Sequence, residues 1–146
     1  MVTLVKLQTL GMIPLLALHR AHQMSQEFLY CGEFISDEGV EPVARALADC
    51  SWRIELRRSG YDGTLYLMTP HSQEIDLEMD SGQSRHFLFS GAVDGTVERA
   101  LTLLADFSRC LTAGGCTHRV EVYDDAKALI GYFHHRWTKE QHEPAD

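Results

Sequence analysis

The apolar residues of this chain change their spacing in the same order twice, and that order limits the folds open to it. Each time, a period of two typical of strands gives way to a helical period and then returns for two further strands. The first set spans residues 28–67 and the second spans residues 86–136. A further alternating stretch, Glu74 to Asp80, lies between them. We therefore expect an α+β fold with about seven strands and two main helices.

Local signals mark the ends of several strands. The first strand is predicted from Phe28 to Ile35 and should break or bulge near Gly32, because glycine weakens strand pairing. Apolar and charged residues alternate over 52–56, which predicts a half-buried strand there. The last strand should run from Ala128 to about Arg136 after a turn.

Two stretches have the apolar spacing of helices. The shorter stretch runs from Val40 to Leu47, and Pro42 is acceptable there because it falls in the first turn. The longer stretch has its apolar face over Val97–Leu111. We expect this helix to begin at an Asp94 N-cap and to end at Gly114-Gly115, where glycine can adopt the C-cap conformation.

The two sets also resemble each other residue by residue. The segment Phe28–Gly32 corresponds to Phe87–Gly91, and the segment 52–56 corresponds to 118–122 with its Arg and Glu in register. Two interpretations remain open: an internal duplication, or two amphipathic units that follow the same patterning rules. Either one predicts a single antiparallel or mixed sheet with both helices on one face, and duplication adds a pseudo-two-fold axis.

The first 23 residues differ from the rest of the chain. Their apolar stretch, Leu10–Leu18, is interrupted by Pro14 and is shorter than the roughly 20 residues of a membrane span. The regular pattern begins just after Met24. We therefore expect residues 1–23 to be an N-terminal extension, helical or not native to the protein, and residues 24–146 to form a single domain.

The charge of the chain restricts the class of partner. The 146 residues carry a formal net charge of -8, with 45% apolar residues. That apolar fraction is typical of a globular protein with a core. A negative surface repels phosphate backbones and anionic lipids, so we expect no nucleic-acid or membrane partner. A basic protein partner is favoured, although acidity can also serve solubility alone, and a homodimer is left open.

Catalytic and cofactor motifs are not recognisable in the sequence. It contains no phosphate-binding glycine loop, no nucleophile elbow and no zinc-protease helix. Its four cysteines (Cys31, Cys50, Cys110 and Cys116) have no close-paired spacing, and we interpret them as reduced, mostly buried thiols of a cytoplasmic protein, with disulfides as the alternative for a secreted protein. The sequence therefore predicts no cofactor and a protein that is not an enzyme, although active sites can lack sequence motifs.

Eight histidines invite a metal hypothesis. Neighbours in a strand point to opposite faces, so His134 and His135 cannot easily share an ion. A tight hairpin around Asp125-Ala126 would place Cys116 opposite His135, which provides two ligands where zinc needs three or four. We therefore predict no metal site.

The acidic strand between the two sets is the strongest candidate for a binding surface. Its carboxylates alternate with apolar residues and would lie about 7 Å apart on one sheet face. They belong to Glu74, Asp76, Glu78 and Asp80. This face is either a solvated outer surface or an electrostatic landing site for a basic partner. Tyr132 and Trp137 could supply the aromatic anchors of such an interface, or they could equally be core residues.

Two family resemblances bear on function. Residues 95–137, with a long helix followed by His118–Asp124 and then His134–Trp137, resemble small bacterial immunity proteins encoded beside secreted toxins. That resemblance implies a cytoplasmic, non-catalytic antitoxin that plugs a toxin's active site. The repeated strand-helix-strand-strand order resembles the gyrase-inhibitor-like fold, which implies a cleft for small molecules. The extra strand from Glu74 departs from that fold.

The leading hypothesis from sequence is a cytoplasmic binding protein of the immunity or antitoxin type. It would neutralise a basic protein partner through the acidic strand, with Tyr132 and Trp137 as anchors. A small-molecule sensor with a cleft between duplicated halves is the first alternative. An enzyme without a recognisable motif is the second.

Overall fold

Seven strands and two helices make up the part of the chain that the computed structural model describes, residues 26–70, 74–80 and 85–138. In chain order they are β1 (Gln26–Ile35), α2 (Glu41–Leu47), β2 (Glu55–Arg58), β3 (Leu65–Met68), β4 (Glu78–Asp80), β5 (His86–Gly95), α3 (Val97–Ala113), β6 (Thr117–Tyr123) and β7 (Leu129–His135). The expected α+β class is confirmed. The extension expected over residues 1–23 lies outside the described residues.

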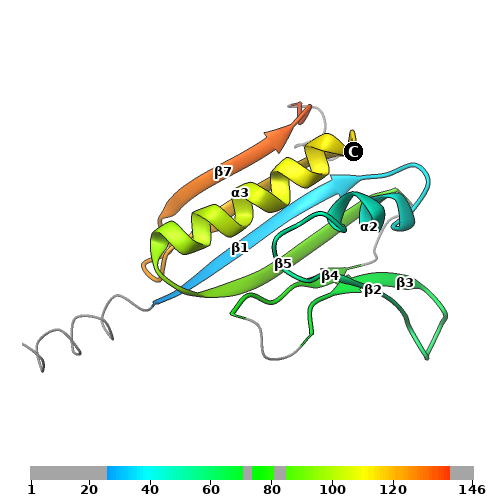
Figure 1. The fold of residues 1–146 in the computed structure, drawn as a ribbon, viewed down its shortest axis with the longest axis horizontal. Coiled ribbons are helices and arrows are strands. Elements are labelled where there is room, and N and C mark those ends of the chain that lie inside the picture. Colours follow the sequence, from blue (N-terminus) through cyan, green and yellow to red (C-terminus); the bar gives the residue numbers. More distant parts are fainter. Residues whose placement is uncertain (1–25, 71–73, 81–84, 139–146) are drawn as a thin grey trace, which may run out of the picture.

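Five of the strands form one antiparallel sheet in the order β4-β5-β1-β6-β7. The two ten-residue strands β1 and β5 pair along their whole length in its centre, and Figure 1 shows them crossing the middle of the molecule. β2 and β3 form a separate two-stranded sheet beside β4. The expectation of a single sheet therefore holds for five strands but not for the β2–β3 hairpin.

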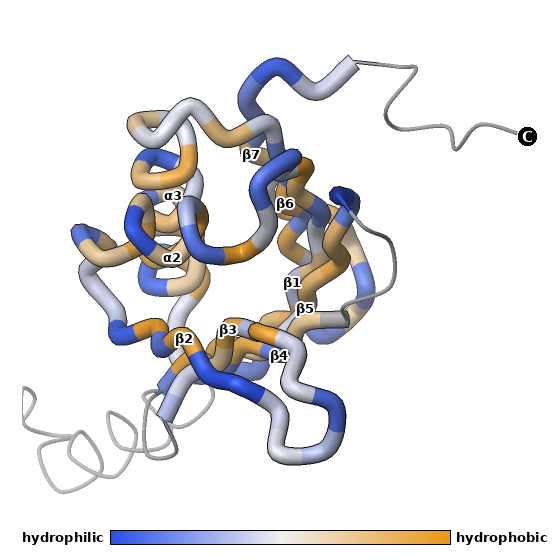
Figure 2. The backbone as a smooth tube through the Cα atoms, turned by 90° about the vertical axis from the view of Figure 1, so that its right-hand side faces the viewer, coloured by the Kyte–Doolittle hydropathy of each residue, from blue (hydrophilic) through white to orange (hydrophobic). Residues whose placement is uncertain are grey.

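Both helices cover the same side of the large sheet (Figure 2). The apolar stripe of α3 is buried against the sheet through residues that include Ala100, Leu104 and Phe107. From the strands, Phe28, Phe34 and other alternate residues point toward the helices and are almost completely buried. Each such side chain contributes roughly 1.5–3 kcal/mol by leaving water. The core therefore lies between the helices and one face of the sheet.

Three local predictions are wrong. β1 continues through Gly32 without a bulge, because both neighbouring strands pair with it in one register. β5 extends to Gly95, so Thr96 rather than Asp94 caps α3, and its side chain accepts a hydrogen bond from the backbone N–H of Arg99. Trp52 precedes β2, and its indole N–H donates to the Leu103 carbonyl at 3.1 Å.

The central strand pair has two-fold symmetry in its register. Tyr30 lies opposite Gly91, and Phe89 lies opposite Gly32. The alignment that matches Phe28 with Phe87 also matches Tyr30 with Phe89 and Gly32 with Gly91, so it converts each of these pairs into the other. A Cβ at Gly32 would lie 2.5 Å from Cζ of Phe89, and a Cβ at Gly91 would lie 2.6 Å from the hydroxyl oxygen of Tyr30, so either one would collide with the aromatic side chain opposite. The register is therefore consistent with the internal duplication, but β4 occupies the position beside β5 that the β2–β3 hairpin would take.

Candidate binding face

The side of the large sheet opposite the helices is uncovered by any other described element, as the edge-on view in Figure 2 shows. Alternation sends Tyr30 toward the helices and Leu29 toward this opposite side, where Leu29 is 49% exposed. Leu88 on β5 faces the same way and is 48% exposed. We call this surface the open face.

Strand register arranges the open face in rows that cross all five strands. The two central rows are Asp80–Leu88–Glu33–Arg119–His134 and Glu78–Ser90–Cys31–Glu121–Tyr132. Residues directly opposite in antiparallel strands have Cβ atoms about 5 Å apart, so from β5 to β7 the side chains that are neighbours in a row lie side by side. Acidic and basic groups therefore lie side by side in the middle of the open face, among uncharged residues.

Glu33 is the centre of this arrangement. The residue is only 7% exposed, although it lies on the solvent side of the sheet. Its Oε1 atom is 2.5 Å from Nε2 of His86, and its Oε2 atom accepts a hydrogen bond of 2.5 Å from Nε of Arg119. A buried carboxylate is costly unless it is paired, and here both of its oxygens are paired.

Arg119 links Glu33 to the rest of the face. Burial would lower the pKa of its guanidinium, but the hydrogen bond and charge of Glu33, and then the charge of Glu121, raise that pKa. Its Nη1 atom lies 3.2 Å from Oε2 of Glu121, and its guanidinium carbon lies 5.7 Å from the centre of the Trp137 ring. The position over that ring is a cation–π contact. Arg119 is therefore held from three directions.

Glu121 also accepts hydrogen bonds from its neighbours. The Tyr123 hydroxyl donates to its Oε1 atom at 2.8 Å, and the Cys31 thiol lies 3.8 Å from the same atom. The hydrogen bond to Glu121 raises the pKa of Tyr123. Burial, and then the negative charge of Glu121, raises the pKa of the Cys31 thiol. Cys31 is therefore a protonated thiol at neutral pH, and its position does not favour nucleophilic chemistry.

Two donors at the edge of this network are buried without a hydrogen bond to any described residue. They are Nη1 of Arg119 and Nε1 of Trp137. The first is within ion-pair distance of Glu121 but is not aligned for a hydrogen bond. Unpaired buried donors are uncommon in proteins, so these two atoms are groups that an added acceptor would stabilise.

A hollow of about 390 Å³ opens onto this face. Residues of β1, β4 and β5 line it, together with Arg119 of β6. Glu33 and Glu78 supply carboxylates to its wall, and Leu88 supplies apolar surface. Its volume is within the usual range for small-ligand pockets.

The carboxylates of the predicted acidic strand have different environments in the structure. β4 contains only Glu78–Asp80, and Ile75 makes a single bridge to Val93. The Glu74 carboxylate forms an ion pair with Arg99 of α3, and the Asp76 carboxylate accepts a hydrogen bond of 2.8 Å from the Ala92 N–H. Among the described side chains, Glu78 is an exposed carboxylate beside the hollow, and Asp80 is paired with Leu88 in the strand register.

The two predicted aromatic anchors lie on or beside the open face. Tyr132 is opposite Glu121 and is 45% exposed. Trp137 follows β7, and its ring lies 6.3 Å from that of His86 as well as near Arg119. Sequence reasoning missed the Glu33 cluster, although a charged residue between Gly32 and Phe34 in an apolar strand is the signal that could have indicated it.

The histidines are not arranged as the tight hairpin predicted. His135 lies opposite His118 rather than Cys116, because the β6–β7 connection is longer and a bulge follows Val122. His118 is completely buried and its Nε2 atom is 2.7 Å from the hydroxyl of Ser108. Burial lowers the pKa of His118, so this pair is a neutral core contact with no access for a substrate.

Neither helix in the described part of the chain is long and apolar enough to cross a membrane. Comparisons of the chain with models of protein families, with curated proteins and with solved structures found no match.

Proposed function

We propose that this protein is a non-catalytic binding protein that holds a basic protein partner against its open face. The carrying observation is a sheet surface left uncovered by helices, with carboxylates beside exposed apolar side chains. Glu27, Glu78 and Asp94 are exposed there, around the paired Glu33 and Arg119. Such a field accelerates encounter with cationic surfaces and disfavours anionic ones.

The apolar groups on the same face supply what charge alone does not. Leu29, Leu88 and Tyr132 are each close to half exposed. Interfaces combine buried apolar and aromatic anchors with a polar rim, and the anchors carry most of the affinity. These three side chains are the proposed anchors, and the surrounding carboxylates are the proposed rim.

The resemblance of residues 95–137 to immunity-type proteins suggests which partner this is. We propose a bacterial toxin with a basic surface, neutralised in the cytoplasm of the cell that makes both proteins. An enzyme that cleaves nucleic acid or another polyanion has such a surface, because it must attract negative charge. An acidic protein face would compete for the same groups.

The test compares capture by two variants with matched charge changes. Glu78→Lys reverses a carboxylate of the open face, and Glu98→Lys reverses an exposed carboxylate on α3, on the other side of the sheet. Wild-type and E98K chains should capture the same protein from an extract of the source cell and should release it as salt is raised. E78K should lose about tenfold in association rate.

Two controls keep the test specific. Lysozyme, a basic protein with no expected relation to this chain, should bind E78K and E98K weakly and equally, because the two variants have the same net charge. Leu88→Lys should weaken capture through a higher dissociation rate, because it removes an anchor. Equal capture by wild-type, E78K and L88K chains would exclude the open face. Ultracentrifugation of the free chain would show whether a second copy occupies that face instead.

A small-molecule sensor is the second candidate, and the hollow of about 390 Å³ favours it. Its carboxylates and the Leu88 side chain suit a cationic aromatic ligand. Ethidium, a cationic aromatic dye, would bind with enhanced fluorescence that Leu88→Trp abolishes by filling the hollow. Unchanged fluorescence on mixing dye and wild-type chain would remove this candidate.

A further inference from the structure

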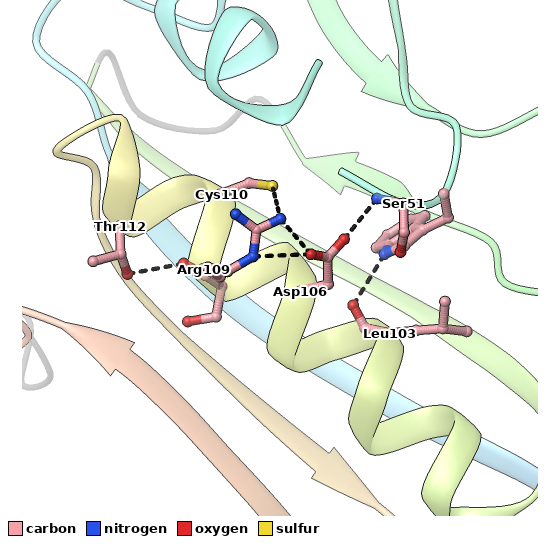
Figure 3. A network of polar contacts seen from close by, with 8 residues as sticks. Ser51, Leu103, Asp106, Arg109, Cys110 and Thr112 are labelled. Carbon is pink, nitrogen blue, oxygen red and sulfur yellow. Dashed lines mark hydrogen bonds and ion pairs between the residues drawn. The ribbon is translucent and has the colours of Figure 1, made fainter. Parts of the chain in front are cut away.

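A second cluster of chemically active side chains lies on the helical side of the molecule. Asp106 and Cys110 are one turn apart on α3, and Cys50 belongs to the connection that follows α2. Figure 3 shows Asp106 and Cys110 on the same side of α3, with Ser51, the neighbour of Cys50, facing Asp106. Residues at i and i+4 of a helix share a face, so the helix presents an oxygen and a sulfur together.

The three ligand atoms are close enough to share one ion. The two Sγ atoms and a carboxylate oxygen all lie within 4.8 Å of one another. Some point is then within about 2.8 Å of all three, only slightly more than the about 2.3 Å of a zinc–thiolate bond. A rotamer adjustment of a few tenths of an ångström would complete three coordination bonds. Water can supply the fourth ligand of a tetrahedral site.

The carboxylate of Asp106 is already oriented. Its Oδ2 atom accepts a hydrogen bond of 2.6 Å from the backbone N–H of Ser51, while Oδ1 receives Nε of Arg109 at 3.0 Å. Burial raises the pKa of Asp106, but hydrogen bonds from Ser51 and then Arg109 outweigh it and lower the pKa to about 2. The group is therefore a carboxylate at neutral pH, with one oxygen fixed by backbone in the way that supporting contacts fix metal ligands.

We propose that Cys50, Asp106 and Cys110 bind a thiophilic divalent cation of the Zn²⁺ type. The ligand set favours this class, because thiolates select soft or borderline metals and reject Mg²⁺ and Ca²⁺. Binding joins the end of α2 to α3, since its ligands come from both sides of that contact. The cation releases two thiol protons on binding and takes the place of positive charge beside Asp106.

Arg109 is the internal competitor for this site. Its Nη2 atom donates to Oδ1 of Asp106 and lies 3.5 Å from Sγ of Cys110. Its side chain is 62% exposed, so the guanidinium can swing into water when a cation arrives. A cation and Arg109 cannot both occupy Oδ1 comfortably, because like charges in contact repel.

The two remaining cysteines provide matched controls. Cys31 lies on the open face beside Glu121, and Cys116 lies near the Ile35 carbonyl. Among the described residues, neither shares a cluster of three potential ligands. A Cys→Ser change at Cys31 therefore removes a thiol that is partly exposed, like that of Cys50, without affecting the proposed site.

The experiment titrates Cd²⁺ into the fully reduced chain and follows the ultraviolet charge-transfer absorption of cadmium–thiolate bonds. We expect one equivalent of Cd²⁺ per chain, displaced by Zn²⁺ but not by Mg²⁺. Cys50→Ser and Cys110→Ser should each remove at least half of the absorption, and Cys31→Ser should leave it unchanged. Undiminished absorption in both C50S and C110S, or its loss in C31S, would overturn the proposal.

A second pair of variants separates coordination from general thiol reactivity. Arg109→Gln removes the competing cation and should tighten Cd²⁺ binding by about tenfold, whereas Asp106→Asn should weaken it by about 10–100-fold. Arg45→Gln, on the exposed surface of α2, is the control for loss of one positive charge. Equal affinities in R109Q, D106N and wild type would show that Asp106 is not a ligand and would overturn the three-ligand site.

Discussion

The ring of Tyr30 occupies the space that a side chain at Gly91 would fill. A Cβ at residue 91 would lie 2.6 Å from the Tyr30 hydroxyl oxygen and 2.0 Å from the carbonyl oxygen of Asp76. That hydroxyl donates to the same carbonyl at 2.6 Å. Tyr30 therefore crosses over β5 and ties β1 to the segment that leads into β4.

Gly91→Ala should destabilise the fold by about 1–3 kcal/mol, because the added methyl must displace backbone or the Tyr30 ring. Gly60→Ala is the matched control, since nothing lies within 4 Å of a Cβ at that position. Urea unfolding followed by circular dichroism measures both. Equal midpoints for the two variants would contradict the close approach.

Glu33→Gln should cost about 3 kcal/mol of stability, because it leaves the largely buried Arg119 with only part of its compensating charge. Glu27→Gln makes the same chemical change at an exposed position of the same strand and should cost less than about 0.5 kcal/mol. The difference should persist at high salt, since buried pairs are weakly screened. A difference that vanishes in salt would show that Glu33 behaves as a surface charge.

Trp52→Ala should destabilise the protein by about 3–5 kcal/mol, because it empties a buried site stacked on Phe107. Trp52→Phe keeps an aromatic ring there but loses the hydrogen bond to the Leu103 carbonyl, so it should cost about 1–2 kcal/mol. Tyr61→Ala, at a residue that is 98% exposed, should be neutral within about 0.5 kcal/mol. Thermal and urea unfolding would rank the three variants.

Stability should fall as the pH drops from about 7 to about 5, with His118 as a principal cause. Burial lowers the pKa of this imidazole in the folded chain, whereas in the unfolded chain it titrates near 6.5. Below that value the unfolded chain binds the extra proton, so each pH unit costs up to about 1.4 kcal/mol until the folded pKa is reached.

Two histidine variants isolate this effect. His118→Asn should lower stability at pH 7 but flatten its decline toward pH 5. His134→Asn, at an exposed neighbour that slightly lowers the pKa of His118, should keep most of the decline. The free energy of unfolding from urea titrations across this pH range is the measurement. Parallel curves for H118N and wild type would assign the decline to other groups.

The part of the fold that follows from local pattern could be predicted from sequence. The apolar stripe and the glycine end of α3 give its length almost directly, because both signals act within a few residues. The N-cap could not be placed this way, because β5 pairs with β1 up to Gly95 and so moves the start of α3 to Thr96. The departure of β2–β3 from the large sheet also depends on packing between distant segments.

Residues of the candidate face could be predicted from sequence only where the alternation of a strand determines which side of the sheet a side chain takes. Glu78 and Tyr132 could be assigned to a strand surface for that reason, and register places both in one row. The burial of Glu33 could not be read from its neighbours in sequence. It depends on Arg119 and His86, which reach it from two other strands.

The pairing of β1 and β5 in the middle of the sheet also determines the kind of contact that a partner can make. β1 is bonded to β5 on one side and to β6 on the other, so its peptide groups are already committed. A molecule bound to this surface at β1 can therefore contact only side chains. Among the described strands of this sheet, main-chain strand addition is possible at the edges β4 and β7, and β4 has just three residues, two of them acidic.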